Sequence, residues 1–287
     1  MLNLFSWRKK VPRVALALGA GGARGLAHIP ALEALDELGI KPVAIAGASM
    51  GAVVGASYAA GMSGKDIRDF ALDKFRGSRS FTRRLVSHQI ERMRAHLRET
   101  RSIRGTPVRF DAAAVAMDFL PSNLPKTFEE LKIPLTVVAT DFWRRESVVY
   151  DKGPLFPVIA GSMAIPGLLR PVEFDGRILI DGGVVNPLPF DLLRAHADIV
   201  IAVDLTRLAD EKSLAIPGAQ ESLIAAAYIM SNAIVQEKLK SSAPDILLRP
   251  NVNAFGALEF ARATPILKAS EPIKEELKRK LGALLDA

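Results

Sequence analysis

The stretch at residues 43–55, Val-Ala-Ile-Ala-Gly-Ala-Ser-Met-Gly-Ala-Val-Val-Gly, joins a strand pattern to a helix pattern. Its first five residues form an apolar run typical of a short buried strand, and the small residues of 50–60 are typical of a helix. Between them lies the pattern Gly-x-Ser-x-Gly, in which Gly47 and Gly51 permit a sharp turn that raises the hydroxyl of Ser49 above the sheet. The stretch therefore predicts a strand–turn–helix unit that carries a nucleophilic serine. A serine that only caps the helix is the alternative interpretation.

The same alternation of strand and helix runs along most of the chain. Apolar runs predict further strands at 13–19, 133–140, 147–150, 177–180, 199–204 and 246–248. Helical spacing predicts helices at 23–38, 63–74, 155–164, 221–240 and 265–281. Short strands that alternate with helices predict an α/β fold with a mostly parallel sheet covered on both faces. We expect one domain, made of a basic extension at 1–12, a core at 13–205 that carries an insert at 74–109, and a C-terminal part at 206–287.

A glycine-rich loop, Gly19-Ala-Gly-Gly-Ala-Arg-Gly25, follows the first predicted strand and precedes a helix. Glycines let the backbone approach a ligand, and free amides at a helix N-terminus point toward negative charge, so the loop suits a phosphate or an oxyanion. A dinucleotide-binding fingerprint fits poorly, because its third glycine falls on Arg24 and the second strand ends in Ala46-Gly47 instead of an acidic residue. The Walker pattern also fails, since Gly64-Lys65 is followed by Asp66. A turn that serves only tight packing remains open.

A second chemical signal is the carboxylate in Arg177-Ile-Leu-Ile-Asp-Gly-Gly183, where a predicted strand ends at Asp181. The carboxyl ends of parallel strands gather at one edge of a sheet, so we expect Asp181 to share that edge with Ser49. Partial desolvation would make an aspartate a useful base near neutral pH. Asp204 and Asp141 also end predicted strands and compete for this role. An ordinary turn is the alternative interpretation of Asp-Gly-Gly.

The histidines offer no clear partner for Ser49. The chain has four of them, His28, His88, His96 and His196, and none follows a late strand, where a Ser–His–Asp hydrolase would place it. We expect the helix after the glycine loop to hold His28 beside that loop and out of reach of Ser49. Ser162 lies late in a predicted helix and lacks a trailing glycine, so we do not expect it to be a nucleophile. The pattern therefore favours a base other than histidine.

Taken together and in this order, the three motifs resemble the patatin-like phospholipase family over about residues 13–205. The family's oxyanion loop matches Ala20-Gly-Gly-Ala-Arg-Gly25, its nucleophile motif matches 47–51, and its Asp-Gly-Gly motif matches 181–183. The segment 161–166, followed by Arg170-Pro171, is also similar. One departure is Ala20, which stands where the family has a glycine.

The resemblance implies a three-layer α/β/α sandwich and hydrolysis of lipid or phospholipid esters by a Ser–Asp dyad, without a metal or other cofactor. It implies that Ser49 is the nucleophile and Asp181 the general base. The implied oxyanion hole consists of Gly21, Gly22, Ala23 and Arg24. The implied supporting positions are Gly25, Gly47, Gly51, Gly182 and Gly183. For the side chain of Arg24, three roles stay open: orienting the loop, meeting a phosphate, or forming an ion pair. A protein that keeps the fold but only binds lipid or a partner is the alternative function.

Composition limits the chemistry and the partners. The 287 residues are 49% apolar and 24% charged, as in an ordinary globular protein, and the absence of cysteine excludes a disulfide framework and a thiolate nucleophile. The net charge of +7 is concentrated in residues 74–109, which hold 11 basic and two acidic residues. The remainder is nearly neutral, so we do not expect a nucleic-acid partner.

The basic insert also carries an apolar stripe. Its residues recur at helical spacing beside several arginines: Val86, Ile90, Met93 and Leu97. Such a basic amphipathic helix suits an anionic lipid surface and a lid over Ser49, and a helix docked on the core with solvated arginines is the alternative. No run of about 18 apolar residues predicts a transmembrane helix, and residues 1–10 lack the order of a signal peptide. We expect a cytoplasmic protein, in which residues 74–109 offer a peripheral contact with an anionic membrane.

Overall fold

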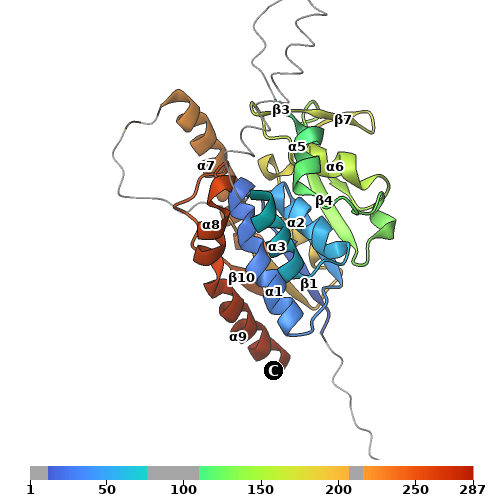
Figure 1. Ribbon diagram of the computed structural model, residues 1–287, viewed down its shortest axis with the longest axis vertical. Helices are drawn as coiled ribbons and strands as arrows, with labels where there is room; N and C mark the ends of the chain where they lie inside the picture. The colour runs from blue at the N-terminus through green and yellow to red at the C-terminus, as the bar shows by residue number, and fades with distance from the viewer. Residues whose placement is uncertain (1–11, 76–109, 207–215, 217, 287) are drawn as a thin grey trace, which may run out of the picture.

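The computed structural model describes residues 12–75, 110–206, 216 and 218–286 (Figure 1). Within these ranges the central element is an eight-stranded sheet in the order β10-β9-β1-β2-β4-β8-β7, with β5 paired to β4. Its strands are β1 (Val14–Leu18), β2 (Ala44–Ala48), β4 (Leu135–Asp141), β5 (Glu146–Tyr150), β7 (Val172–Phe174), β8 (Arg177–Asp181), β9 (Ile199–Val203) and β10 (Ile246–Leu248). A two-stranded sheet pairs β3 (Phe110–Asp111) with β6 (Leu169–Arg170). Residues 1–11 of the predicted basic extension and residues 76–109 of the predicted insert lie outside the described residues.

Helices cover both faces of the large sheet. The α-helices are α1 (Ile29–Glu37), α2 (Met50–Ala59), α3 (Gly64–Phe75), α5 (Ala112–Phe119), α6 (Leu155–Ser162), α7 (Ala219–Ser241), α8 (Ala263–Ser270) and α9 (Pro272–Asp286). Short 3-10 helices are η1 (Gly22–His28), η2 (Phe128–Glu130), η3 (Gly182–Val184), η4 (Phe190–Leu193) and η5 (Phe260–Arg262). One face packs mainly against α1, α2, α5, α6, α8 and α9, and the other packs against η4 and α7. The α/β class and the helix-covered sheet predicted from the sequence are confirmed.

The sheet is parallel over its larger part. Strands β10, β9, β1, β2 and β4 are joined by parallel ladders. Beyond them β4 pairs antiparallel with β5 and β8, and β8 pairs antiparallel with β7. The predicted hairpin of β4 and β5 is present. The strand β10 and the helices α8 and α9 join the same sheet and the same core as the N-terminal half.

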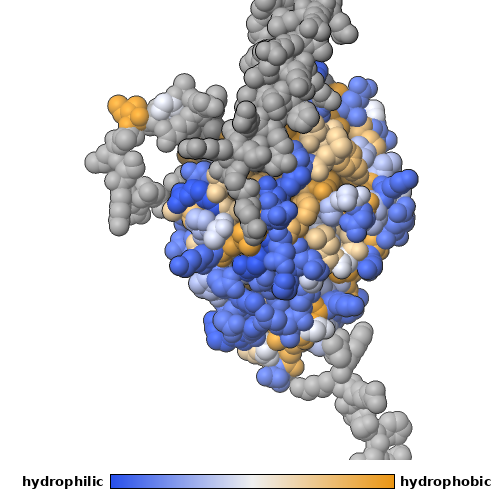
Figure 2. Space-filling view, viewed as in Figure 1, coloured by the Kyte–Doolittle hydropathy of each residue, from blue (hydrophilic) through white to orange (hydrophobic). Residues whose placement is uncertain are grey.

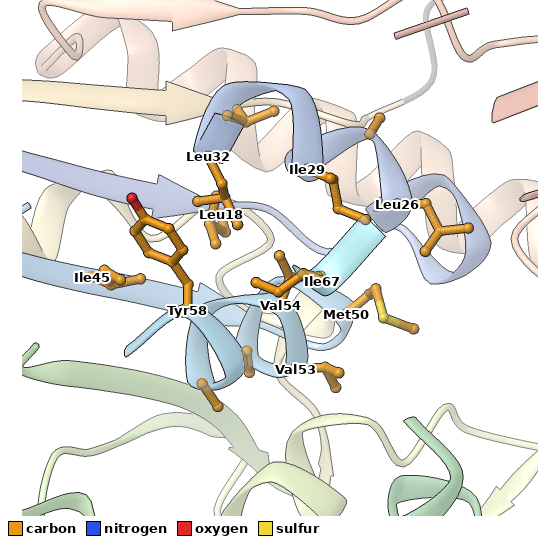
Figure 3. Close-up of a cluster of buried hydrophobic side chains, with 14 of the residues drawn as sticks. Leu18, Leu26, Ile29, Leu32, Ile45, Met50, Val53, Val54, Tyr58 and Ile67 are labelled. Carbon is orange, nitrogen blue, oxygen red and sulfur yellow. The ribbon is translucent and has the colours of Figure 1, made fainter. Parts of the chain in front are cut away.

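Alternation along the strands explains why the two faces differ. In β1, Leu16 and Leu18 point to one face, whereas Ala15 and Ala17 point to the other. Figure 3 shows Leu18 among apolar side chains of α1 and α2, so the large residues build the main core. The alanine face leaves room for η4 to approach the sheet closely, and Phe190 is buried there.

The helix predicted at 23–38 forms in two pieces, which corrects the sequence-based expectation. Residues Gly22–His28 are 3-10 helix, and the α-helix begins only at Ile29. Pro30 accounts for the break, because a continuous α-helix would need its missing N–H and would drive its ring against the carbonyl of Leu26. In α1 the proline stands in the first turn, where an amide has no intrahelical partner to lose.

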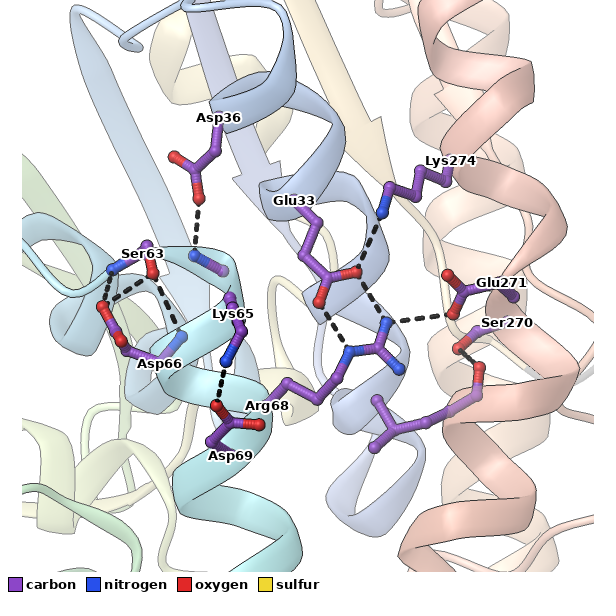
Figure 4. Close-up of polar contacts among 12 residues, drawn as sticks. Glu33, Asp36, Ser63, Lys65, Asp66, Arg68, Asp69, Ser270, Glu271 and Lys274 are labelled. Atoms are coloured by element: carbon purple, nitrogen blue, oxygen red, sulfur yellow. Dashed lines mark hydrogen bonds and ion pairs between the residues drawn. The ribbon is translucent and has the colours of Figure 1, made fainter.

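An ion-pair network ties α1, α3 and α9 together (Figure 4). Arg68 donates two hydrogen bonds to the carboxylate of Glu33, at 2.5 and 2.6 Å, and a third to Glu271 at 2.9 Å. Lys274 lies 3.5 Å from the same carboxylate. Figure 2 shows a mostly hydrophilic surface over α1 and α3. The side chain of Glu33 is nevertheless only 10% exposed, so water screens the charges of this network poorly.

Replacing Arg68 with alanine is expected to lower the free energy of unfolding by about 2 kcal/mol, because it leaves the nearly buried Glu33 carboxylate short of two hydrogen bonds. Lys65→Ala is the matched control, since Lys65 pairs with Asp69 at 2.6 Å on an exposed helix face and should cost at most about 0.5 kcal/mol. Urea unfolding measures both. Equal losses in the two variants would contradict the importance of the Glu33 network.

Candidate active site

Ser49 stands at the turn between β2 and α2 in a strained backbone conformation. Its φ of 53° and ψ of −123° lie outside the regions that serine normally adopts, and such strain is typical of functional sites. The neighbouring glycines make the turn possible: a Cβ on Gly47 would lie 2.6 Å from the carbonyl oxygen of Gly51, and one on Gly51 would lie 2.1 Å from that of Leu18. Helix α2 packs back against β2. The predicted strand–turn–helix unit is therefore present.

The Ser49 hydroxyl donates a hydrogen bond to the carboxylate of Asp181. The distance between Ser49 Oγ and Asp181 Oδ2 is 2.7 Å, and the other carboxylate oxygen accepts the amide of Gly183 at 2.7 Å. Both side chains are buried. Burial raises the pKa of Asp181 to about 6, against the lowering effect of the hydrogen bonds from Ser49 and Gly183. The arrangement is a carboxylate of raised basicity in contact with a serine hydroxyl.

The strand that carries Asp181 does not reach Ser49 in the way that a parallel sheet suggests. Strand β8 is antiparallel to β4, with Asp181 opposite Ala139, whereas β2 is parallel to β4, with Ala48 opposite Val138. Because β5 occupies the other edge of this part of β4, β2 and β8 must lie end to end along a single edge. Their carboxyl ends meet there, so Ser49 and Asp181 are close because two strands of opposite direction meet, and not because parallel strands end at one edge.

Two glycines after Asp181 allow the carboxyl ends of β2 and β8 to lie this close together. A Cβ on Gly182 would lie 2.0 Å from the carbonyl oxygen of Val138, and one on Gly183 would lie 2.7 Å from Cβ of Ala20. Neither gap accommodates a side chain. The Asp-Gly-Gly motif therefore packs against β4 on one side and against the glycine-rich loop on the other.

The glycine-rich loop offers fewer free amides than expected. The amide of Ala23 donates to Ala257 at 2.6 Å, and that of Arg24 donates to Gly21 at 3.2 Å, so neither is free as the loop stands. Within the described part of the chain, no acceptor faces the amides of Gly21 and Gly22. Of the four residues expected to form the oxyanion hole, Gly21 and Gly22 are thus the two whose backbone amides have no bonded acceptor among the described residues. The loop is also packed onto α2, because a Cβ on Gly25 would lie 2.2 Å from the side chain of Met50.

The Arg24 side chain is buried beneath the loop. Its guanidinium stacks over the ring of Tyr228 at 4.3 Å, and its Nε donates to the carbonyl of Gly21 at 3.4 Å. These contacts join the loop to α7 and favour the loop-orienting role among the three that the sequence left open.

The competing carboxylates are engaged elsewhere. Asp204 binds Arg249 at 2.9 Å and Thr206, and Asp141 binds Arg144 and Arg177. Hydrogen bonds from the Arg144 backbone, followed by its side chain and Arg177, lower the pKa of Asp141, which makes it a weaker base.

His28 lies beside the loop, as expected. Its Nε2 donates to the carbonyl of Gly19 at 2.8 Å, and burial lowers its pKa to about 4, so the ring is neutral at physiological pH. His88 and His96 lie outside the described residues. His28 thus braces the loop through Gly19, whereas the Ser49 hydroxyl bonds to Asp181.

Sequence reasoning missed Ser162. Its buried hydroxyl accepts the backbone amide of Ser49 at 2.9 Å and donates to the carbonyl of Val138 at 2.7 Å. The place of Ser162 late in a predicted helix, without a trailing glycine, speaks only against a second nucleophile. The only available signal was its place in segment 161–166, one of the stretches that resemble the family.

The fold and the site define an α/β protein with a serine–aspartate pair at the carboxyl end of β2, facing a glycine-rich loop. The patatin-like phospholipase family matches residues 16–194, and the chain belongs to that family. It is 42% identical over 196 residues to an uncharacterized NTE family protein of Mycobacterium tuberculosis. The aligned residues cover 68% of this chain and 49% of that protein. The chain thus spans about half the length of this relative.

Two more distant similarities accompany this match. Lysophospholipase NTE1 of Coccidioides immitis is 26% identical over 292 residues, covering 93% of this chain and 18% of that protein. The crystal structure of VipD from Legionella pneumophila aligns with a TM-score of 0.49 at 14% identity, covering 94% of this chain and 67% of that one. The family resemblance drawn from the three motifs is confirmed by the family match over residues 16–194.

Proposed function

We propose that the protein is a serine hydrolase that cleaves the carboxylic ester bonds of lipids, phospholipids among them, with Ser49 as nucleophile and Asp181 as general base. The observation that carries the proposal is the 2.7 Å hydrogen bond from Ser49 Oγ to a buried carboxylate of raised pKa. A base works best when its pKa lies near the working pH, and a pKa of about 6 is closer to neutrality than that of an ordinary aspartate. Family membership and the lysophospholipase name of one relative support a lipid ester as the substrate.

The proposed reaction has two halves. Ser49 Oγ attacks the ester carbonyl while Asp181 takes its proton, and the tetrahedral intermediate collapses as Asp181 returns that proton to the leaving alcohol. Water then attacks the acyl-enzyme, Asp181 accepts a proton from it, and Ser49 receives that proton as the fatty acid leaves. The sum is ester plus water giving acid plus alcohol.

The negative charge of each tetrahedral intermediate is proposed to be held by the amides of Gly21 and Gly22. Both belong to the loop that packs against the Asp-Gly-Gly motif through Ala20 and Gly183. One donor of this kind is typically worth about 3 kcal/mol of transition-state stabilisation. The amide of Ala23 could join them only after giving up its bond to Ala257.

The test of the proposed function is labelling by a fluorophosphonate probe, which reacts with activated serines. Wild-type protein should be labelled, the modified peptide should contain Ser49, and a medium-chain lipid ester should slow the labelling by competing for the site. A panel of phospholipids, lysophospholipids and neutral esters then defines the substrate. If the folded protein is neither labelled nor able to hydrolyse any of these esters, the proposal of a serine hydrolase is rejected, and a protein that only binds lipid or a partner is favoured.

Activity is expected to depend on the ionisation of Asp181. Because the base must be deprotonated, kcat/KM should fall about tenfold per pH unit below pH 6, the value to which burial raises its pKa, and should be level above it. Initial rates between pH 4.5 and 8 with a soluble ester measure this. A profile that stays level down to pH 4.5 would contradict Asp181 as the base.

Residues 74–109 carry 11 basic and two acidic residues, so we propose that this segment brings the protein to anionic lipid. Among the described helices, none combines the length and apolar character needed to cross a bilayer. Sedimentation with vesicles of phosphatidylcholine alone or with phosphatidylglycerol added should show binding only to the anionic vesicles. Replacing Arg94, Arg98 and Arg101 with glutamine should weaken it, and unchanged binding would reject the proposed contact.

A further inference from the structure

The parallel ladder between β2 and β4 is interrupted at Ser49. The amide of Ile45 donates to the carbonyl of Pro134 at 2.9 Å, and the same alternation carried two steps further would send the amide of Ser49 to the carbonyl of Val138. The Ser162 hydroxyl stands between these two groups. It accepts the amide at 2.9 Å and donates to the carbonyl at 2.7 Å, so it replaces one direct rung by two hydrogen bonds.

The Ser162 hydroxyl replaces the ladder hydrogen bond at the point where the chain leaves the sheet. Ser49 has a φ of 53°, a value that serine adopts only when its surroundings enforce it. A direct bond from its amide to Val138 would keep the residue in the plane of the ladder, alongside β4. The intervening hydroxyl increases the separation between the Ser49 amide and the Val138 carbonyl. It forms a hydrogen bond with each of them, so neither is left unpaired at the turn.

The segment that supplies Ser162 also holds Asp181. Two residues after Ser162, the carbonyl of Ala164 accepts the amide of Asp181 at 3.0 Å. The segment cannot shift easily, because a Cβ on Gly161 would lie 2.8 Å from Cβ of Leu179 in β8. The C-terminal end of α6 thus fixes the backbone of the serine and the backbone of the aspartate at the same time.

We propose that Ser162 is a positioning residue that holds the backbone of Ser49 in the conformation that points its hydroxyl at Asp181. The inference rests on the proposed function, since it concerns the geometry of the same hydrolytic pair. It assigns Ser162 no contact with substrate. Its role is to hold the Ser49 turn out of the ladder, at the point where the carboxyl ends of β2 and β8 meet.

Removing the hydroxyl should act on the chemical step more than on substrate binding. In Ser162→Ala the Ser49 amide and the Val138 carbonyl lose their shared partner, and the shortest way to pair them again is a direct rung that draws Ser49 back toward β4. A displacement of about 1 Å at a reacting group can cost about 100-fold in rate. We expect kcat to fall 30- to 100-fold, with KM within twofold of the wild-type value.

The matched control is Ser270→Ala. Ser270 is also fully buried and donates its hydroxyl to a backbone carbonyl, that of Leu267 at 2.9 Å, but it lies at the end of α8. Both variants should lose similar thermal stability, and only Ser162→Ala should lose kcat and the rate of fluorophosphonate labelling. Ser162→Cys, which keeps most of the volume and forms weaker hydrogen bonds, should give an intermediate kcat.

The outcomes separate this inference from the proposed function. A folded Ser162→Ala protein with kcat within twofold of wild type, or a loss confined to KM, would overturn the positioning role. An equal loss of kcat in Ser270→Ala would do the same, because it would show a general effect of stability. If Ser162→Ala does not fold, Ser162→Cys is judged by the same criterion. A wild-type protein that is neither labelled nor hydrolytic would instead reject the proposed function.

Discussion

Asp181→Asn is expected to lower kcat by about 10⁴-fold and to leave the fold intact. An asparagine side chain has nearly the same shape, and its oxygen can still accept the amide of Gly183 that now donates at 2.7 Å. Its NH₂ group can occupy the place of the oxygen that faces Ser49, but it cannot take a proton. Ser49→Ala provides the background rate. Full activity of a verified Asp181→Asn protein would reject the proposed dyad.

The same variant is expected to be more stable than wild type at neutral pH. Burial raises the pKa of Asp181 from 3.8 to about 6, so the folded state holds this proton more tightly than the unfolded state does. As pH rises from about 4 to 6, the folded protein must give up a proton that the unfolded chain has already lost, and stability falls. Above pH 6 the cost is constant, at most about 3 kcal/mol. Asparagine, which stays neutral, avoids it.

His28 titrates in the same range with the opposite sign. Burial lowers its pKa to about 4, so the unfolded chain takes up a proton near pH 6.5 that the folded protein binds only near pH 4, and this contribution to stability is lost as pH falls. The stability of wild type alone therefore does not isolate Asp181. The difference between Asp181→Asn and wild type does, because His28 is common to both.

The measurement is urea unfolding of both proteins at pH 4, 5, 6 and 7. The stability gain of Asp181→Asn should be near zero at pH 4, grow through pH 6, and then level off. A gain that is the same at every pH would show that the charge of Asp181 is not its source. Because an asparagine before Gly182 can deamidate back to aspartate, the mass of the variant is checked before each assay.

The closeness of Ser49 and Asp181 could be predicted from the sequence because each residue lies in a local pattern. Ser49 lies in a strand–turn–helix pattern that spans few residues, and Asp181 ends an apolar run before two glycines. The α/β class followed from alternating periodicities in the same way. The apolar spacing of residues 23–38 does not distinguish 3-10 helix from α-helix, so it did not predict the 3-10 geometry of η1. Pro30 was the one signal in the sequence that an α-helix would not run through this stretch unbroken.

What could not be predicted depends on contacts between distant segments. The five residues of β8 do not show in which direction the strand runs within the sheet. The direction depends on its antiparallel pairing with the end of β4 that extends beyond β2. The amide of Ala23 is occupied by Ala257, which lies far along the chain. The Ser162 hydroxyl accepts the amide of Ser49 across 113 positions of sequence, and the resemblance of segment 161–166 to the family does not indicate that partner.

Gly51→Ala is expected to destabilise the protein by about 3 kcal/mol or more and to reduce the labelling of Ser49 in the protein that remains folded. The added methyl carbon would lie 2.1 Å from the carbonyl oxygen of Leu18 and 2.6 Å from its carbonyl carbon. These are backbone atoms in the middle of the sheet, so the only relief is to move the start of α2 away from β1. That movement carries Ser49 with it, because Ser49 is the residue that precedes α2.

Gly55→Ala is the matched control on the same helix. Its methyl group would meet only side-chain atoms, 3.2 Å from Ile45 and 3.4 Å from Leu135, and alanine favours a helix over glycine by about 1 kcal/mol. Its stability should therefore stay within about 1 kcal/mol of wild type, with unchanged labelling. Urea unfolding and the rate of fluorophosphonate labelling, taken together, distinguish the two glycines. If Gly51→Ala were as stable and as reactive as Gly55→Ala, the close approach of the turn to β1 would not be what holds Ser49 in place, and the strain at this residue would need another source.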